Sequence, residues 1–114
     1  MEALEMTLLF DYYGELLTQR QKQCIDMRYN QDLSLGEIAQ ELQVSRQGVY
    51  DNLSRGEALL RNMEEKTGCV RRDLSCREAA RNISRFASQL LDHSDPLVRD
   101  LAKQILGQTD LFEE

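Results

Sequence analysis

Hydrophobic and polar residues recur with a helical period along most of the chain, most clearly over Leu33–Leu53. Four apolar residues lie there at spacings of three and four: Leu35, Ile38, Ala39 and Leu42. This spacing places them on one face of a helix. Ser34 and Glu37 have the spacing of a capping box, in which each side chain accepts a hydrogen bond from an exposed backbone N–H group. The pattern predicts a helix over 34–42.

A second helix is predicted directly after a two-residue turn, over 45–66. Ser45 is a suitable N-cap, and Val49 and Leu53 form the inward face of the first turns. Ala39 is small where the two helices would cross. This combination is typical of a helix-turn-helix motif, whose second helix presents its start to the major groove of DNA. An ordinary helical hairpin shares single features of the pattern, but not their combination.

Four further helices are expected, over 4–17, 18–29, 69–91 and 96–106, so the fold class is all-α. A single Pro and few aromatic residues agree with helices rather than a sheet. Thr67 and Gly68 provide a helix stop and a hinge. We therefore expect a helix-turn-helix domain over 1–67, resembling a small bundle, and a C-terminal helical hairpin arm over 68–114. Gly107 is expected to end the last helix.

Gly56 lies on the apolar seam of the second helix of the motif. The seam has the spacing of a heptad pattern: Val49, Leu53, Gly56, Leu60 and Met63. Because Gly costs about 1 kcal/mol relative to Ala inside a helix, its position indicates a close helix crossing. We expect the helix over 4–17 to fold back onto this seam.

The chain has a net charge of −6, with 14 Lys and Arg against 20 Asp and Glu, which is unfavourable for a nucleic-acid-binding protein. The distribution of charge reduces this objection. Residues 1–17 and 89–114 each have a net charge of −4, so the interior is at +2. A local basic face can bind phosphates on an acidic protein, although long-range attraction to DNA would be weak.

The sequence contains no recognisable catalytic or metal-binding pattern. Its three Cys residues lack a CxxC pair, and its one His, His93, is far from all of them. No Gly-rich phosphate loop or nucleophile–base set is present. We expect no enzyme activity, metal, cofactor or small-molecule substrate. No apolar run approaches the roughly 20 residues of a membrane span, and the N-terminus is acidic, so we expect a cytoplasmic protein without membrane contact.

The first two thirds of the chain resembles region 4 of bacterial sigma factors and, within that class, is more similar to the YlxM family of small helix-turn-helix proteins. The residues that resemble the family are Leu9–Tyr13, Leu16–Thr18, Asp32–Ala39 and Val44–Asn52. The resemblance implies a regulator of genes of the signal recognition particle pathway, a role proposed for the family from gene neighbourhood. The chain lacks the promoter-melting and polymerase-binding regions of a complete sigma factor.

The exposed start of the second motif helix contains the candidate DNA-binding residues: Ser45, Arg46, Gln47, Tyr50, Asn52 and Arg55. Gln and Asn can pair with adenine edges, and Arg with guanine or phosphate. Double-stranded DNA is therefore the expected partner. An alternative is a protein-interaction adaptor that binds a component of the signal recognition particle pathway without specific DNA binding. The net charge of −6 and Gly48 favour the adaptor, whereas the Ser45–Gln47 cap and the basic interior favour DNA binding.

The arm has more apolar surface than a small domain needs to bury, so we expect a homodimer. The predicted interface residues are Ile83, Phe86, Leu90, Leu101 and Ile105. The competing arrangement is a closed monomer in which the arm covers residues 4–17. Three arginines at intervals of four, Arg77, Arg81 and Arg85, form either a solvated face that pairs with acidic helices or a phosphate-binding stripe.

Overall fold

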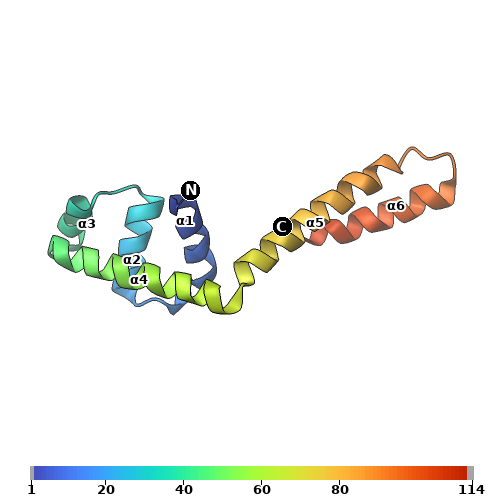
Figure 1. Ribbon diagram of the computed structural model, residues 1–114. Helices are drawn as coiled ribbons and strands as arrows, with labels where there is room; N and C mark the ends of the chain where they lie inside the picture. Colours follow the sequence, from blue (N-terminus) through green and yellow to red (C-terminus); the bar gives the residue numbers. More distant parts are fainter. Residues whose placement is uncertain (1, 113–114) are drawn as a thin grey trace. The chain divides into compact units, whose positions relative to one another are not determined.

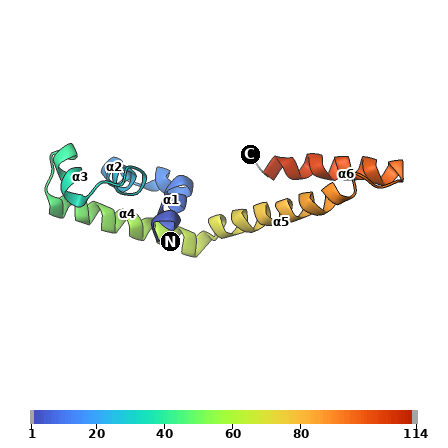
Figure 2. The same ribbon diagram turned by 90° about the horizontal axis from the view of Figure 1, so that it is seen from above.

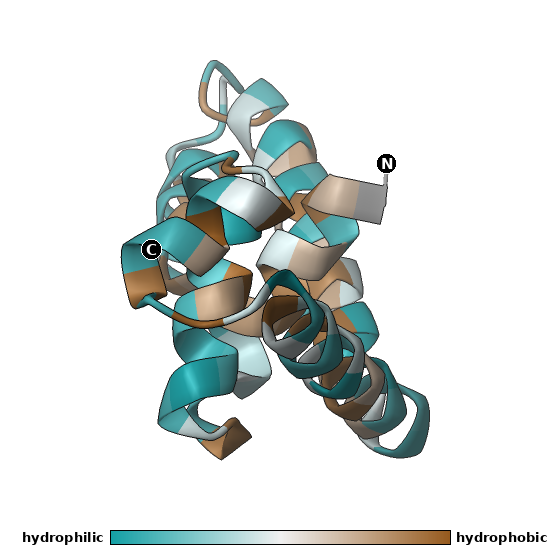
Figure 3. Cartoon of the chain, turned by 90° about the vertical axis from the view of Figure 1, so that its left-hand side faces the viewer, coloured by the Kyte–Doolittle hydropathy of each residue, from teal (hydrophilic) through white to brown (hydrophobic). Residues whose placement is uncertain are grey.

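The computed structural model describes residues 2–112, and within that range it consists of helices and connecting turns without a strand (Figure 1). The helices are α1 (Glu2–Tyr13), α2 (Gln19–Ile25), α3 (Leu35–Leu42), α4 (Arg46–Thr67), α5 (Cys69–Gln89) and α6 (Pro96–Thr109). Two 3-10 turns, Gly14–Leu16 and Asp110–Phe112, and a π-helical turn, Asp26–Asn30, accompany them. The all-α prediction is confirmed. Hydrophilic and hydrophobic residues occur together on the helices, as the hydropathy colours show (Figure 3).

The chain divides into two compact units, Met1–Val70 and Arg71–Glu114. In the first, the helix-turn-helix unit, α1, α2 and α3 all pack on the long helix α4 (Figures 1 and 2). The most deeply buried side chains come from all four helices: Met6, Cys24, Ile25, Ile38, Val49 and Leu60. This core holds α3 and α4 in the arrangement that forms the candidate site.

Gly56 lies where α2 crosses α4, not where α1 does. A Cβ atom at Gly56 would be only 2.8 Å from Ile25 Cδ1, so the absence of a side chain allows the close approach. The expectation of a close crossing is correct, and α1 packs on α4 as expected, but the helix that approaches Gly56 itself is α2. The end of α1 packs instead further along α4, where the Tyr13 hydroxyl lies 2.6 Å from Glu64 Oε1.

The predicted helix over 18–29 begins as expected but changes its hydrogen-bonding pattern after Ile25. Thr18 and Gln21 form a reciprocal capping box at its start. Over Asp26–Asn30 the chain adopts a π-helical turn, in which the Gln31 N–H donates to the Asp26 carbonyl. The Asp26 carboxylate also accepts hydrogen bonds from the side-chain amides of Asn30 (2.7 Å) and Gln31 (3.0 Å), and these bonds stabilise the wider turn.

The second unit, the arm, is a hairpin of α5 and α6 (Figures 1 and 2). Asp95 caps α6, its carboxylate accepting from the Leu97 N–H at 2.9 Å, and Pro96 occupies the first helical position. The prediction that Gly107 ends α6 is wrong, because the helix continues to Thr109. A glycine stop requires the left-handed conformation. Among the described glycines only Gly68, at the end of α4, has a positive φ, of 64°.

Candidate nucleic-acid interface

Side chains at the start of α3 and of α4 fix the helix-turn-helix motif. Ser34 Oγ accepts from the Glu37 N–H at 3.1 Å, and Glu37 Oε1 accepts from the Ser34 N–H at 2.9 Å. These hydrogen bonds to Ser34 lower the pKa of the Glu37 carboxyl below its usual value of 4.5. Ser45 Oγ accepts from the Gly48 N–H at 2.9 Å. Ser45 is therefore an N-cap as predicted, and its hydroxyl lone pair is partly used by the helix itself.

The turn between α3 and α4 depends on Gln43, which has the left-handed conformation with φ 57° and ψ 46°. The backbone N–H of Gln43 bonds back to the carbonyls of Ala39 and Gln40. The Val44 N–H also donates to the Ala39 carbonyl, at 3.0 Å. Glycine usually occupies this conformation at the end of a helix, so the motif places a Gln side chain at a position of backbone strain.

The first two turns of α4 divide into a buried and an exposed face. Val49 is fully buried and Leu53 almost so, which anchors the helix on the core. Arg46, Gln47 and Tyr50 are exposed, and 54% of Tyr50 is accessible. The structure thus brings three of the predicted residues together on the solvent side of the helix. Hydrogen-bonding side chains there could reach base edges or phosphates.

Two further candidates lie apart from this group. Asn52 is half-buried, and its amide Nδ2 donates to the carbonyl of Gly48 at 2.9 Å. Asn52 is five residues beyond Gln47, which is one full turn plus about 140°, so it faces a different side of α4. Arg55 is exposed two turns beyond Gln47, well placed for a phosphate. Ser54, which sequence reasoning missed, is exposed at seven residues beyond Gln47 and so lies on its face.

Gln47 and Arg46 are each held by a neighbour. Gln47 Nε2 donates to Asp51 Oδ1 at 3.0 Å, one turn along the exposed face. The Arg46 guanidinium lies over Gly36 at the start of α3, where an added Cβ atom would be 3.0 Å from Arg46 Nη2. Gly36 therefore leaves space for the Arg46 side chain, a role that the hydrophobic pattern could not reveal.

Arg20 is a second basic residue beside the motif that sequence reasoning did not select. It belongs to α2, yet its Nη1 lies 3.5 Å from the carbonyl of Leu42 at the end of α3. Burial raises the pKa of the Cys24 thiol, and the positive charge of Arg20 partly offsets this increase. Only the packing of α2 and α3 on the same helix, α4, brings Arg20 to the turn, so no local signal in the sequence identifies it.

The acidic residues near the motif limit the positive potential of the face. Glu37 and Glu41 line a shallow polar depression on α3 with Leu33 and Gln40, and Asp51 lies on the exposed face of α4. Over residues 2–112 no three His, Cys, Asp or Glu side chains form a group that could hold a metal ion. No described helix is long and apolar enough to span a membrane.

A model of the helix-turn-helix family described as YlxM/p13-like matches residues 1–90 of the chain, which includes the whole motif. The chain belongs to this family. A family of helix-turn-helix proteins supports a DNA-binding role, in agreement with the exposed start of α4.

Similar relatives are proteins of the same family, named only as UPF0122 proteins. The relative from Acetivibrio thermocellus is 53% identical over 82 residues, which covers 72% of this chain and 70% of the relative. That from Thermoanaerobacter sp. is 55% identical over 71 residues, 62% of this chain and 61% of the relative. The relative from Clostridium kluyveri is 39% identical over 107 residues, 94% of this chain and 90% of the relative. The last match therefore includes most of the arm.

Proposed function

We propose that this protein binds double-stranded DNA through the exposed start of α4 and acts as a transcription regulator rather than an enzyme. The observation that supports this most directly is the combination of a buried Val49–Leu53 anchor with Arg46, Gln47 and Tyr50 exposed in the same first turns of α4. In helix-turn-helix proteins this region of the second helix contacts base edges. Membership in a helix-turn-helix family agrees with the same role.

Each exposed residue has a role that fits its chemistry. Gln47, whose amide is oriented by Asp51, reads an adenine edge once that hydrogen bond is exchanged for one to the base. Arg46 and Arg55 neutralise phosphates or pair with guanine. Arg20, which lies beside the turn between α3 and α4, contacts the DNA phosphate backbone. The resemblance to the YlxM family suggests genes of the signal recognition particle pathway as the regulated genes.

Two copies act together in this proposal. A single recognition helix contacts few base pairs, and helix-turn-helix proteins commonly gain affinity by presenting two such helices to two half-sites. A homodimer is therefore the functional unit.

Fluorescence anisotropy with a labelled duplex tests DNA binding itself. We expect affinity to fall steeply as salt rises from 50 to 200 mM, because each neutralised phosphate contributes a slope of about −0.9 to the logarithmic plot. A signal that stays at the background level at 50 mM salt would overturn the proposal.

A second candidate function is an adaptor that binds a protein component of the signal recognition particle pathway. The observation in its favour is the presence of acidic side chains on the exposed surface of the motif. Asp51 lies on α4, and Glu37 and Glu41 lie on α3. The variant Asp51→Asn separates the two functions. It should strengthen duplex binding by removing repulsion from phosphate, whereas it would weaken an adaptor that uses Asp51 to contact a basic partner. Affinity purification with and without nuclease gives an independent comparison.

A further inference from the structure

The arm has no large buried apolar side chain within its described residues. The hydrophobic residues buried there are only Ala80, Ala87 and Ala102. By contrast, all its Phe and several of its Leu and Ile side chains are exposed, with Ile83 at 48%, Phe86 at 58% and Leu101 at 50%. A unit of this size without a core of its own is too small to be stable alone, and such units are usually completed by a partner.

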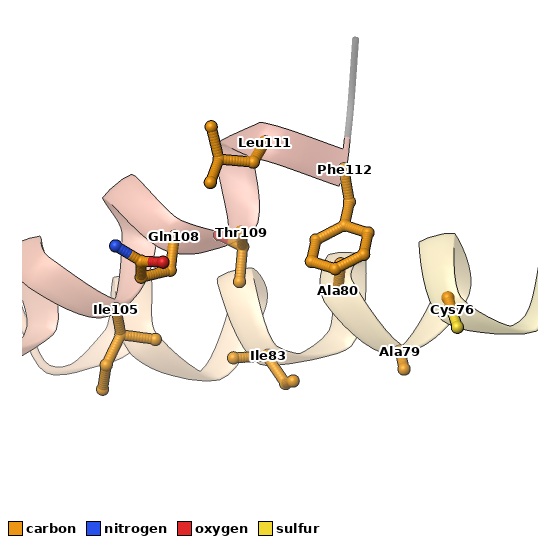
Figure 4. Close-up of a pocket in the computed structure, with 9 residues that line it drawn as sticks. All are labelled: Cys76, Ala79, Ala80, Ile83, Ile105, Gln108, Thr109, Leu111 and Phe112. Atoms are coloured by element: carbon orange, nitrogen blue, oxygen red, sulfur yellow. The ribbon is translucent and has the colours of Figure 1, made fainter. Parts of the chain in front are cut away.

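Some of the exposed apolar residues of the arm line a common groove. Its volume is about 650 Å³, and Cys76, Ala79 and Ile83 of α5 face it together with Ile105 of α6 (Figure 4). On α5 the spacing of three and four continues beyond the groove to Phe86, which extends the same face along the helix. We call this surface the arm face.

We propose that the arm face binds the arm face of a second copy of this chain, so that two hairpins form a four-helix bundle. The role of this dimer rests on the proposed function, because the second copy supplies the second recognition helix. The pairing of the two arms itself does not require DNA. Two-helix hairpins with one exposed apolar face pack in this way, with facing helices nearly parallel or antiparallel. A twofold axis makes such a contact self-complementary.

The chemistry of the arm face favours a second copy over a different protein. None of the residues lining the groove is charged, and charge complementarity is what usually selects a foreign partner. The arginines of α5 nearest to the groove lie at its border, where Arg77 Nη1 donates to the Phe112 carbonyl at 3.1 Å and the Arg85 guanidinium lies 5.2 Å from the centre of the Phe86 ring. Depletion of charge at the centre is typical of homodimer interfaces.

The size of the arm face also fits a dimer. Its half-exposed Phe, Leu and Ile side chains present on the order of 600 Å² of apolar surface per copy, close to the roughly 800 Å² per partner of a standard interface. A patch of that size is at the upper end of what a soluble monomer exposes.

A matched pair of variants tests the contact by light scattering. Ile83 and Leu74 are nearly equally exposed, at 48% and 44%. They are nine residues apart on α5, which is about two and a half turns, so they point to opposite sides. At roughly 100 µM we expect the wild type and Leu74→Glu to have the mass of two chains and Ile83→Glu that of one. Far-UV circular dichroism should show that all three remain largely helical, with a loss of helicity in Ile83→Glu no greater than the unpaired arm accounts for.

The native cysteines give a second measurement on the unaltered chain. Cys76 lines the groove, whereas Cys69 is exposed outside it. At high protein concentration alkylation of Cys76 should be about tenfold slower than in dilute protein, by mass action, while the rate at Cys69 stays the same.

The inference is overturned by a wild type that is monomeric at high concentration, as expected if the arm folds back within one chain or binds another protein. It is also overturned by a dimer that survives Ile83→Glu and leaves Cys76 reactive. A monomer that still binds duplex DNA would contradict only the dimer, and a dimer without duplex binding only the proposed function.

Discussion

The hydroxyl of Tyr13 donates a hydrogen bond to Glu64 Oε1 across 2.6 Å, and the same oxygen accepts from the Val70 N–H at 3.0 Å. Thr67 Oγ1 lies 2.7 Å from the Tyr13 hydroxyl and accepts from the Cys69 N–H. One carboxylate thus joins the end of α1, the last turns of α4 and the first turn of α5. Charged acceptors form the stronger hydrogen bonds in proteins, so this contact stabilises the end of the helix-turn-helix unit.

We predict that Tyr13→Phe lowers the thermal unfolding midpoint, because Glu64 loses a hydrogen-bond donor while the ring remains in place. The pH dependence should change as well. Burial and the hydrogen bond to Glu64 raise the pKa of Tyr13 above its usual 10. The corresponding stability is therefore complete below the unfolded-state pKa of 10, and is lost as pH rises through the folded-state value.

Unfolding followed from pH 9 to pH 11 checks this prediction. Tyr29 also has a pKa raised by burial, so it contributes a slope of the same sign. The difference between the wild type and Tyr13→Phe isolates Tyr13, and identical pH profiles would contradict the assigned hydrogen bond.

Gln43→Gly is expected to stabilise the helix-turn-helix unit by about 1 kcal/mol, since a residue with a Cβ atom costs roughly that much in the left-handed conformation. Denaturant unfolding measures the change. Gln40→Gly is the matched control, because Gln40 is exposed inside α3 and the same substitution should destabilise a helix interior by about 1 kcal/mol. If both Gln43→Gly and Gln40→Gly lowered the free energy of unfolding, the turn at Gln43 would not be strained.

Gly56→Val should destabilise the same unit by about 1–3 kcal/mol through overpacking, because a Cβ atom there meets the fully buried Ile25. Ala58→Val lies on the exposed side of the same helix and reports only the lower helix propensity of Val. Thermal unfolding of both variants separates the two effects. Equal midpoints would show that α2 does not approach α4 at Gly56.

The sequence predicts those parts of the motif that depend on neighbouring residues. The capping box of Ser34 and Glu37 and the cap at Ser45 are local, because each hydrogen bond spans three residues. The buried face of α4 follows from helical spacing alone. Helix existence and approximate length were predictable for the same reason.

Features that depend on tertiary packing were not predictable in this way. The position of Arg20 beside Leu42 and that of Arg46 over Gly36 each require two helices to be placed first. The approach of α2 to Gly56 was not predicted, because a glycine indicates a close approach but not its neighbour. Asn52 was selected for its chemistry, although its amide bonds to the backbone of its own helix.

Binding of DNA by the start of α4 can be measured by comparing the duplex affinities of the variants Arg46→Ala and Lys66→Ala. Both residues are exposed cations of α4, but Lys66 lies 20 residues further on, about 30 Å along the helix. We expect Arg46→Ala to weaken duplex binding about tenfold and to reduce the salt slope by about one, while Lys66→Ala matches the wild type. Equal affinities for the two variants, or a larger loss at Lys66, would contradict this expectation.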